Sequence, residues 1–579
     1  MKRRVLPWSI LLGLGLGSLP MLAGCDYSST APPPLTINDS PSEAATNTEA
    51  GKDQAASTTP LAIDNGDPDM KPVILESVIN LIQTAAIKPG GANFEQATTK
   101  LNNYFEGTKP DEYLLSKVAR EFVLTQFPAE SIKVLERPTF ELPDARHLED
   151  CMLYHGIATR IGGTGDDLTR VRRLFDWMIR QVVLVPPQSL AVPGIGQAQA
   201  RPYDVLLRGM ATEGGGSWSE RGWLFMSLCR QLGIDVGILT YTPAESKDET
   251  PWVSAVLIDH KLYLFDHRIG LAIPGPDGNG VATLEDALND PKILDRLDLP
   301  GESPYPVNRK VLLESPSKIG VLLDSSPGYL SPRMLLLQKS LVGKNRTVLF
   351  RDPADQRDQF ASALGTHAGK VSLWNLPVMV VNRLFTDPKF VQATQQALLL
   401  FDSRFPLLYA RIKQLRGDVP DAIQSYMTMR YAEGATVVGG KDPIHPEIQS
   451  AIDHYSAYFL ALAHLERQDT MNAERFFTAT LRNLPAPGAN QPYFFMFRWG
   501  AQTNLAYLLE AKKLNSTAIA YYTESNPTTQ YHGNLLLARE LVWRNPTAAP
   551  PMPLPPAPRP EQEAQQAPSG FAPIDLNRP

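Results

Sequence analysis

The sequence contains little cysteine and no excess of basic residues. Only three of its 579 residues are cysteines, Cys25, Cys151 and Cys229, and whether the last two pair or stay free is left open. No CxxC pair and no Cys/His cluster occurs, so we expect neither a metal nor another cofactor. The 55 lysines and arginines are outnumbered by 61 aspartates and glutamates, giving a net charge of -6. Without a basic excess to contact phosphate groups, nucleic acid is not an expected partner.

The apolar run near the N-terminus is too short to cross a membrane. Trp8 to Met21 has about 14 residues, fewer than the roughly 20 of a membrane-spanning helix. It follows the basic residues 2–4 and ends in Leu22-Ala23-Gly24-Cys25, which resembles the bacterial lipobox. The resemblance implies a cleaved signal peptide and a lipidated Cys25, with a plain secretory signal as the alternative. Several acyl chains would anchor the protein durably, so we expect a lipid-anchored protein of the bacterial cell envelope that faces the periplasm or the exterior.

Helical periodicity begins near Lys71, after a segment that is poor in large apolar residues. It continues in Phe94–Phe105 and Asp111–Phe127, breaks at Glu141–Pro143, and resumes in Asp144–Ile161. Within this last helix, Cys151 and His155 are four residues apart and share a face. Such a pair could be a nucleophile and its base, although a helix face that packs into a core is the more usual explanation.

The stretch from Gly214 to Ile234 organises the middle of the chain. Its residues predict a glycine-rich turn, a helix of about four turns and a stop at Gly233. The elements predicted around it are a helix and short strand before it and a strand and hairpin after it: Asp166–Val182, Val183–Val185, Val236–Tyr241, Trp252–Ile258 and Leu262–Asp266, with Asp259-His260 at the hairpin turn.

This order of elements resembles the transglutaminase-like, papain-related fold. The phrases that carry the resemblance are LFDWMIRQV, LFMSLCRQLGID and LYLFDHRIGLAIPG, and it covers roughly a fifth of the chain. In the family, a Cys begins the helix, a His lies on the first hairpin strand, and an Asp ends the second. The helix dipole and the imidazolium lower the pKa of the Cys, and the Asp holds the His in the useful tautomer.

The chain departs from the family at two of these three positions. Trp218 stands where the Cys is expected, and Thr250, Pro251 and Trp252 occupy the positions where the His is expected. Only Asp266 matches. We therefore expect no catalytic residues, with Trp218, Trp252 and Asp266 as the remnant triad positions. Trp218 would then fill the old cleft, where its indole suits packing or binding of a ligand.

A displaced nucleophile is the alternative that would preserve an enzyme. Ser217 and Ser219 flank Trp218, and Cys151 is a third candidate. No His lies where a base is expected, because His260 is in the turn and His267 should point to the side of its strand opposite to Asp266. Cys229 is expected to pack in the core, far from the N-terminus of its helix.

Residues 291–396 predict a small α/β segment. Its expected strands are Ile319–Leu323 and Thr347–Phe350, and its expected helices are Ser331–Ser340 and Arg357–Leu364.

From about Ala397 the pattern is continuously helical and repeats. Small residues recur at offsets of about twelve and four, and the pattern resembles the tetratricopeptide repeat, although repeat spacings of about 51 and 45 exceed that family's 34. The positions are Ala410/Ala422/Tyr426, Ala461/Ala473/Phe477 and Ala506/Ala518/Tyr522. A generic helical bundle is the alternative. Tyr493, Phe497 and Trp499 could line a groove of such repeats, or belong to the core.

Together these patterns predict an α+β protein in seven parts. They are a signal peptide (1–25), a disordered tether (26–70), a helical region (71–165), a transglutaminase-like domain (166–290), an α/β segment (291–396), tetratricopeptide-like repeats (397–544) and a disordered Pro-rich tail (545–579). We expect a non-catalytic binding or scaffold protein with a protein or peptide partner. The alternative is an envelope amidase, protease or crosslinking enzyme.

Overall fold

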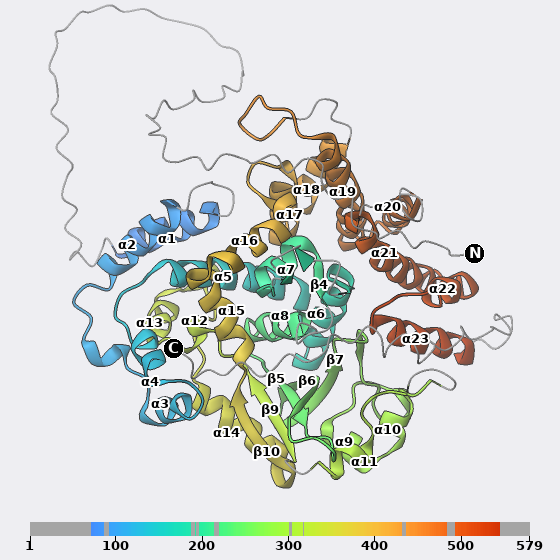
Figure 1. Ribbon diagram of the computed structural model, residues 1–579, viewed down its shortest axis with the longest axis horizontal. Coiled ribbons are helices and arrows are strands. Elements are labelled where there is room, and N and C mark those ends of the chain that lie inside the picture. The colour runs from blue at the N-terminus through green and yellow to red at the C-terminus, as the bar shows by residue number, and fades with distance from the viewer. Residues whose placement is uncertain are drawn as a thin grey trace, which may run out of the picture. The chain divides into compact units, whose positions relative to one another are not determined.

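A six-stranded mixed sheet, here called the central sheet, has helices on both faces and lies in the lower half of the view in Figure 1. The computed structural model describes residues 71–85, 92–186, 191–192, 196–197, 199–212, 219–299, 304–315, 318–430, 436–482 and 492–544. These all belong to one compact unit that begins at Asp64. The predicted lipidation site Cys25, the tether, the tail, Ser217 and Trp218 lie outside the described residues.

The strand order in the central sheet is β10-β9-β5-β6-β7-β8. Its strands are β5 (Asp235–Tyr241), β6 (Thr250–Ile258), β7 (Lys261–Asp266), β8 (Leu271–Ala272), β9 (Ile319–Leu323) and β10 (Ala368–Leu373). Within this sheet, β10 and β9 pair in parallel and all the other neighbouring strands pair antiparallel. The predicted hairpin is confirmed. Asp259 and His260 both have positive φ, 49° and 60°, which suits the two-residue turn between right-twisted strands.

Side chains alternate between the two faces of this sheet and enter two separate hydrophobic clusters. On one face, Phe265 packs with Phe225 of α8 (Ser219–Arg230) and Phe175 of α6 (Asp167–Gln181). On the other face, Leu264 belongs to a cluster with residues of α9 (Leu284–Asn289), α11 (Arg309–Leu313) and α14 (Pro353–Leu364). The predicted helix stop is also confirmed, since Gly233 has a φ of 78° just after α8.

The remaining elements of the middle region are short. They are β1 (Val183–Val185), which pairs in parallel with β4 (Met210–Thr212), β2 (Ala191–Val192), β3 (Gly196–Gln197), α7 (Pro202–Arg208), α10 (Lys292–Asp295), α12 (Pro327–Leu330), α13 (Pro332–Ser340), α15 (Asn375–Thr386) and α16 (Pro388–Ala397).

The N-terminal region is helical, with one correction to the prediction. Its helices are α1 (Lys71–Ala85), α2 (Ala92–Tyr104), α3 (Lys117–Leu124), α4 (Ala129–Leu135) and α5 (Leu142–Gly162). The prediction of continuous helical structure over Asp111–Phe127 was wrong. A 3₁₀ turn ends at Tyr113, and Ser116 then starts α3 by accepting a hydrogen bond from the backbone N–H of Ala119.

The predicted α/β segment 291–396 contributes to the central sheet. The strand Ile319–Leu323 is confirmed as β9, whereas Thr347–Phe350 is not a strand. Its backbone is bound by side-chain amides instead: Gln231 pairs with both the N–H and the carbonyl of Val348, and Gln338 accepts from Leu349 and Phe350. These side-chain amides bind the backbone N–H and carbonyl groups that a neighbouring strand would otherwise bind. The apolar run therefore does not pair with another strand.

The C-terminal helices pack in sequence, each against the next. They are α17 (Pro406–Arg416), α18 (Val419–Arg430), α19 (Pro446–Glu466), α20 (Thr470–Arg482), α21 (Pro492–Ala511), α22 (Asn515–Tyr522) and α23 (Gln530–Arg544). All nine repeat positions from Ala410 to Tyr522 are fully buried, with exposures of 0%. Small residues at these positions therefore lie where helices meet.

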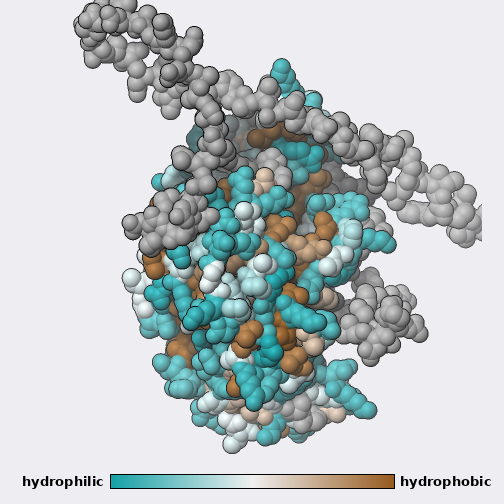
Figure 2. All heavy atoms as spheres, turned by 90° about the vertical axis from the view of Figure 1, so that its left-hand side faces the viewer, coloured by the Kyte–Doolittle hydropathy of each residue, from teal (hydrophilic) through white to brown (hydrophobic). Residues whose placement is uncertain are grey.

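The described residues make up an α+β fold whose surface mixes polar and apolar side chains. Figure 2 shows these two kinds interspersed over the side that lies at the left of Figure 1. Among the described helices, none combines the length and the apolar character that crossing a membrane requires.

Candidate functional site

The described part of the first turn of α8, the helix that would begin with the catalytic Cys in the transglutaminase-like family, is completely buried. Glu220 forms an ion pair of 2.7 Å with Arg208 and accepts hydrogen bonds from the backbone N–H groups of Ala200 and Thr212. Arg221 donates to the carbonyl of Val182 and to the side chain of Gln530. These bonds fix the start of α8 to α7, β4 and α23.

The remnant positions Trp252 and Asp266 are joined through a tyrosine that the sequence analysis did not single out. Trp252 Nε1 donates to the hydroxyl of Tyr305 at 3.0 Å, and this hydroxyl donates to Asp266 Oδ2 at 2.7 Å. Arg268 binds both oxygens of Asp266, at 3.1 and 2.9 Å. Burial opposes the charge of Asp266, but Arg268 and Tyr305 outweigh it and hold the pKa of Asp266 below its usual value.

The expectation that Asp266 occupies a triad position beside the helix is wrong. Asp266 shares its face of β7 with Leu264, which is the face turned away from α8. Trp252 lies in the same cluster as Leu264, because the register between β5 and β6 shifts between Ile238 and Thr240. A bulge of this kind reverses the direction of the side chains beyond it.

His267 lies on the α8 side, in the direction expected from its place after Asp266. Its Nδ1 is 3.1 Å from the hydroxyl of Ser254 on β6. A Cβ on Gly222 would come within 3.1 Å of the imidazole, so this glycine makes room for the ring. Complete burial lowers the pKa of His267 to about 3, so its ring is neutral near pH 7.

Cys151 contacts a histidine, but not the one expected. Its thiol lies 3.6 Å from His147 Nε2 and 3.3 Å from the hydroxyl of Tyr329, whereas His155 lies against Thr159. The correction follows from helix geometry, since residues i−4 and i+4 are both neighbours of position 151. Burial raises the pKa of the Cys151 thiol far above its usual value and lowers that of His147 to about 4. A thiolate–imidazolium pair needs a thiol pKa below its usual value and a histidine pKa above it.

The other predicted residues occupy structural positions. Ser219 is buried at the start of α8, and Cys229 is a fully buried, unpaired thiol in the core. Phe497 is fully buried and stacks on Tyr458 with ring centroids 4.2 Å apart, so the core explanation holds for it. Trp499 is half-buried against the same core, and the side chain of Tyr493 lies outside the described part of the chain.

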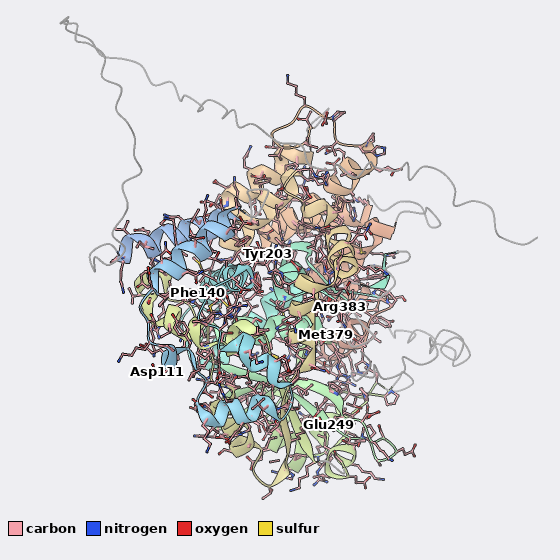
Figure 3. All side chains as sticks on the ribbon, turned by 60° about the vertical axis from the view of Figure 1, so that its left-hand side comes forward. Asp111, Phe140, Tyr203, Glu249, Met379 and Arg383 are labelled. Atoms are coloured by element: carbon pink, nitrogen blue, oxygen red, sulfur yellow. The ribbon has the colours of Figure 1, made fainter. Side chains whose placement is uncertain are left out.

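A cavity of about 310 Å³ opens beside α5, and Trp223 and Ser227 of α8 line part of it. One face of α5 forms its floor, with Pro143, His147, Asp150 and Tyr154 at helical spacing. Its apolar wall comes mainly from α15, the helix that carries the labelled Met379 and Arg383 in Figure 3. The other walls are α4, α8, α12 and α13 together with the start of α7.

Four arginines and two aspartates line this cavity, which makes its wall positively charged. Arg333 pairs with Asp144 at 2.8 Å, and Arg201 pairs with Asp150 at 2.9 Å and with Asp204 at 3.1 Å. Burial raises the pKa of Asp150 to about 6 and that of the neighbouring Glu149 to about 7. The spacing of residues in the sequence does not reveal this cavity, because its lining comes from positions 134 to 386. The polar stripe along α5 is the one local signal of it.

No group of His, Cys, Asp and Glu side chains that could hold a metal ion occurs in the part of the chain that the structure describes. Comparison with protein-family models, with curated proteins and with solved structures finds no match for this chain.

Proposed function

We propose that this chain is a lipid-anchored, non-catalytic binding protein of the bacterial cell envelope. The observation that carries the proposal is the set of groups that bind the carboxylate of Asp266. A triad Asp must orient a histidine, but both oxygens of this one are bound by Arg268, and Tyr305 donates to one of them. On the α8 side, the described residues provide a neutral His267 and no thiolate.

The arrangement of α8 against β5, β6 and β7 supports a transglutaminase-like ancestry that has lost its chemistry. The burial of all nine repeat positions supports tetratricopeptide-like packing of α17 to α22. Stacked helix pairs of this kind offer an extended surface to a protein or peptide partner.

An envelope amidase, protease or crosslinking enzyme is the second candidate, and one observation favours it. Ser254 and His267 form a hydroxyl–imidazole pair of 3.1 Å beside the first turn of α8, which begins at Ser219. Against it, a histidine with a pKa of about 3 is a weak base near neutral pH.

The test is whether the protein reacts with covalent active-site probes or converts a substrate. The full chain should react with neither a fluorophosphonate nor an iodoacetamide probe, and should not join a fluorescent amine to a glutamine peptide. Turnover that disappears in a His267→Gln or Ser254→Ala variant, but persists in His260→Gln at the exposed hairpin turn, would overturn the proposal in favour of the enzyme.

The lipid anchor has its own test. Metabolic labelling with an alkyne-bearing fatty acid should mark the wild-type chain, and Cys25→Ala should abolish both the label and membrane retention. Labelling that persists in this variant would place the acyl chains elsewhere.

A further inference from the structure

The cavity beside α5 contains an arginine that forms no ion pair with any described residue, although Asp204, Asp150 and Glu149 lie near enough to act on its charge. Among the described residues, no hydrogen bond or ion pair reaches the guanidinium of Arg146, and its Nε is a buried donor without an acceptor. The guanidinium lies near the rings of Phe94 and Phe385, at 5.6 and 6.0 Å from their centroids. The other three arginines that line the cavity are paired with carboxylates.

A second polar group of the same wall also lacks a partner. Tyr154 is 3% exposed, and its hydroxyl has no hydrogen-bond partner among the described residues. Arg146 and Tyr154 lie two helical turns apart on α5, and Asp150 lies between them. A buried donor that remains unsatisfied costs about 1–3 kcal/mol, so such groups usually have a ligand or an ordered water.

We propose that this cavity binds a small organic carboxylate with an apolar body. The carboxylate would accept from the Arg146 guanidinium and from the Tyr154 hydroxyl. The apolar body would contact Leu384 and Phe385 of α15 and Trp223 of α8. This inference names a ligand class for the proposed binding function and rests on it.

The charged side chains around the cavity favour a ligand that carries a single negative charge. Asp144 and Asp150 line the cavity, and Glu149 and Asp204 lie behind it. Arg201 pairs with Asp150 and Asp204, and Arg333 pairs with Asp144, so none of these three carboxylates forms an ion pair with Arg146. A phosphate dianion would meet the repulsion of the remaining acidic groups. The volume of about 310 Å³ equals roughly ten water molecules at about 30 Å³ each, which fits a small molecule.

Calorimetry on the full chain with 3-phenylpropionate tests the inference. We expect saturable binding, and binding of the uncharged 3-phenylpropanol at least about tenfold weaker, because a charge-assisted hydrogen bond is lost. Arg146→Gln should weaken binding of the acid about tenfold or more, and Tyr154→Phe about threefold or more. Arg172→Gln, an exposed arginine on α6, is the matched control and should bind as the wild type does.

Tyr154→Phe removes one oxygen and serves if Arg146→Gln fails to fold. Equal binding of the acid and the alcohol, tighter binding of inorganic phosphate, no binding by the wild type, or undiminished binding by Arg146→Gln or by Tyr154→Phe would each overturn the inference. None of these outcomes affects the proposed absence of catalysis, which the labelling and turnover assays decide separately.

Discussion

Replacing Tyr305 with phenylalanine tests the hydrogen-bond network that holds Asp266. The variant loses the 2.7 Å hydrogen bond to the carboxylate and leaves the indole N–H of Trp252, which is fully buried, without its acceptor. A hydrogen bond to a charged group contributes about 1.5–3 kcal/mol, and a stranded buried donor costs about 1–3 kcal/mol. Because Arg268 still binds Asp266, we expect a loss of about 3 kcal/mol in the free energy of unfolding.

Urea denaturation followed by tryptophan fluorescence measures this loss as a lower midpoint at an unchanged slope. Tyr263→Phe is the matched control, since Tyr263 lies on β7, is half-buried, and has no hydrogen bond through its hydroxyl in the described structure. We expect that control to stay within about 0.5 kcal/mol of the wild type. A Tyr305→Phe variant as stable as this control would refute the reasoning that Asp266 is held in a structural network.

Three further predictions use the same denaturation assay. Glu220→Gln leaves Arg208 buried without its counter-charge and should cost about 3–5 kcal/mol; a loss under about 1 kcal/mol would contradict the buried pair. Gly222→Ala places a Cβ 3.1 Å from the imidazole of His267 and should cost about 1–3 kcal/mol, whereas a neutral result would mean that the ring moves freely. The folded-state pKa of Glu149, about 7, exceeds the ordinary 4.5, so its ionisation destabilises the fold increasingly as pH rises through this interval. Glu149→Gln removes that penalty and should gain about 3 kcal/mol relative to the wild type between pH 5 and pH 8; a constant difference would contradict the raised pKa.

Local signals in the sequence predicted much of the central fold. The turn at Asp259-His260, the stop at Gly233 and the strand Ile319–Leu323 depend on neighbouring residues, and all three are present. Their conformations follow from short-range sterics and hydrogen bonds, which a single sequence records.

The direction of side chains at the candidate site could not be predicted in the same way. Whether Trp252 faces α8 depends on one extra residue in the β5–β6 pairing. The residue types at Ile238 and Thr240 give no signal that predicts this bulge. The strand Thr347–Phe350 failed for a related reason, since amides distant in sequence, on Gln231 and Gln338, bind its backbone. Long-range partners decided these features, and the spacing of residues does not contain them.

The C-terminal helices are joined to the central region by buried polar contacts as well as by a shared core. Arg411 of α17, fully buried, donates to the carbonyl of Leu206 on α7 at 2.8 Å. Glu466 of α19 accepts from Gln181 of α6 at 2.9 Å. A chain cut at the predicted boundary near Ala397 would remove Arg411 and Glu466 and would expose to water the apolar residues of the central region that pack in the same hydrophobic cluster as the C-terminal helices. Deleting the helices would therefore disturb the core together with any partner surface, so single substitutions at exposed residues of α17 to α23 are the sounder way to map a protein partner.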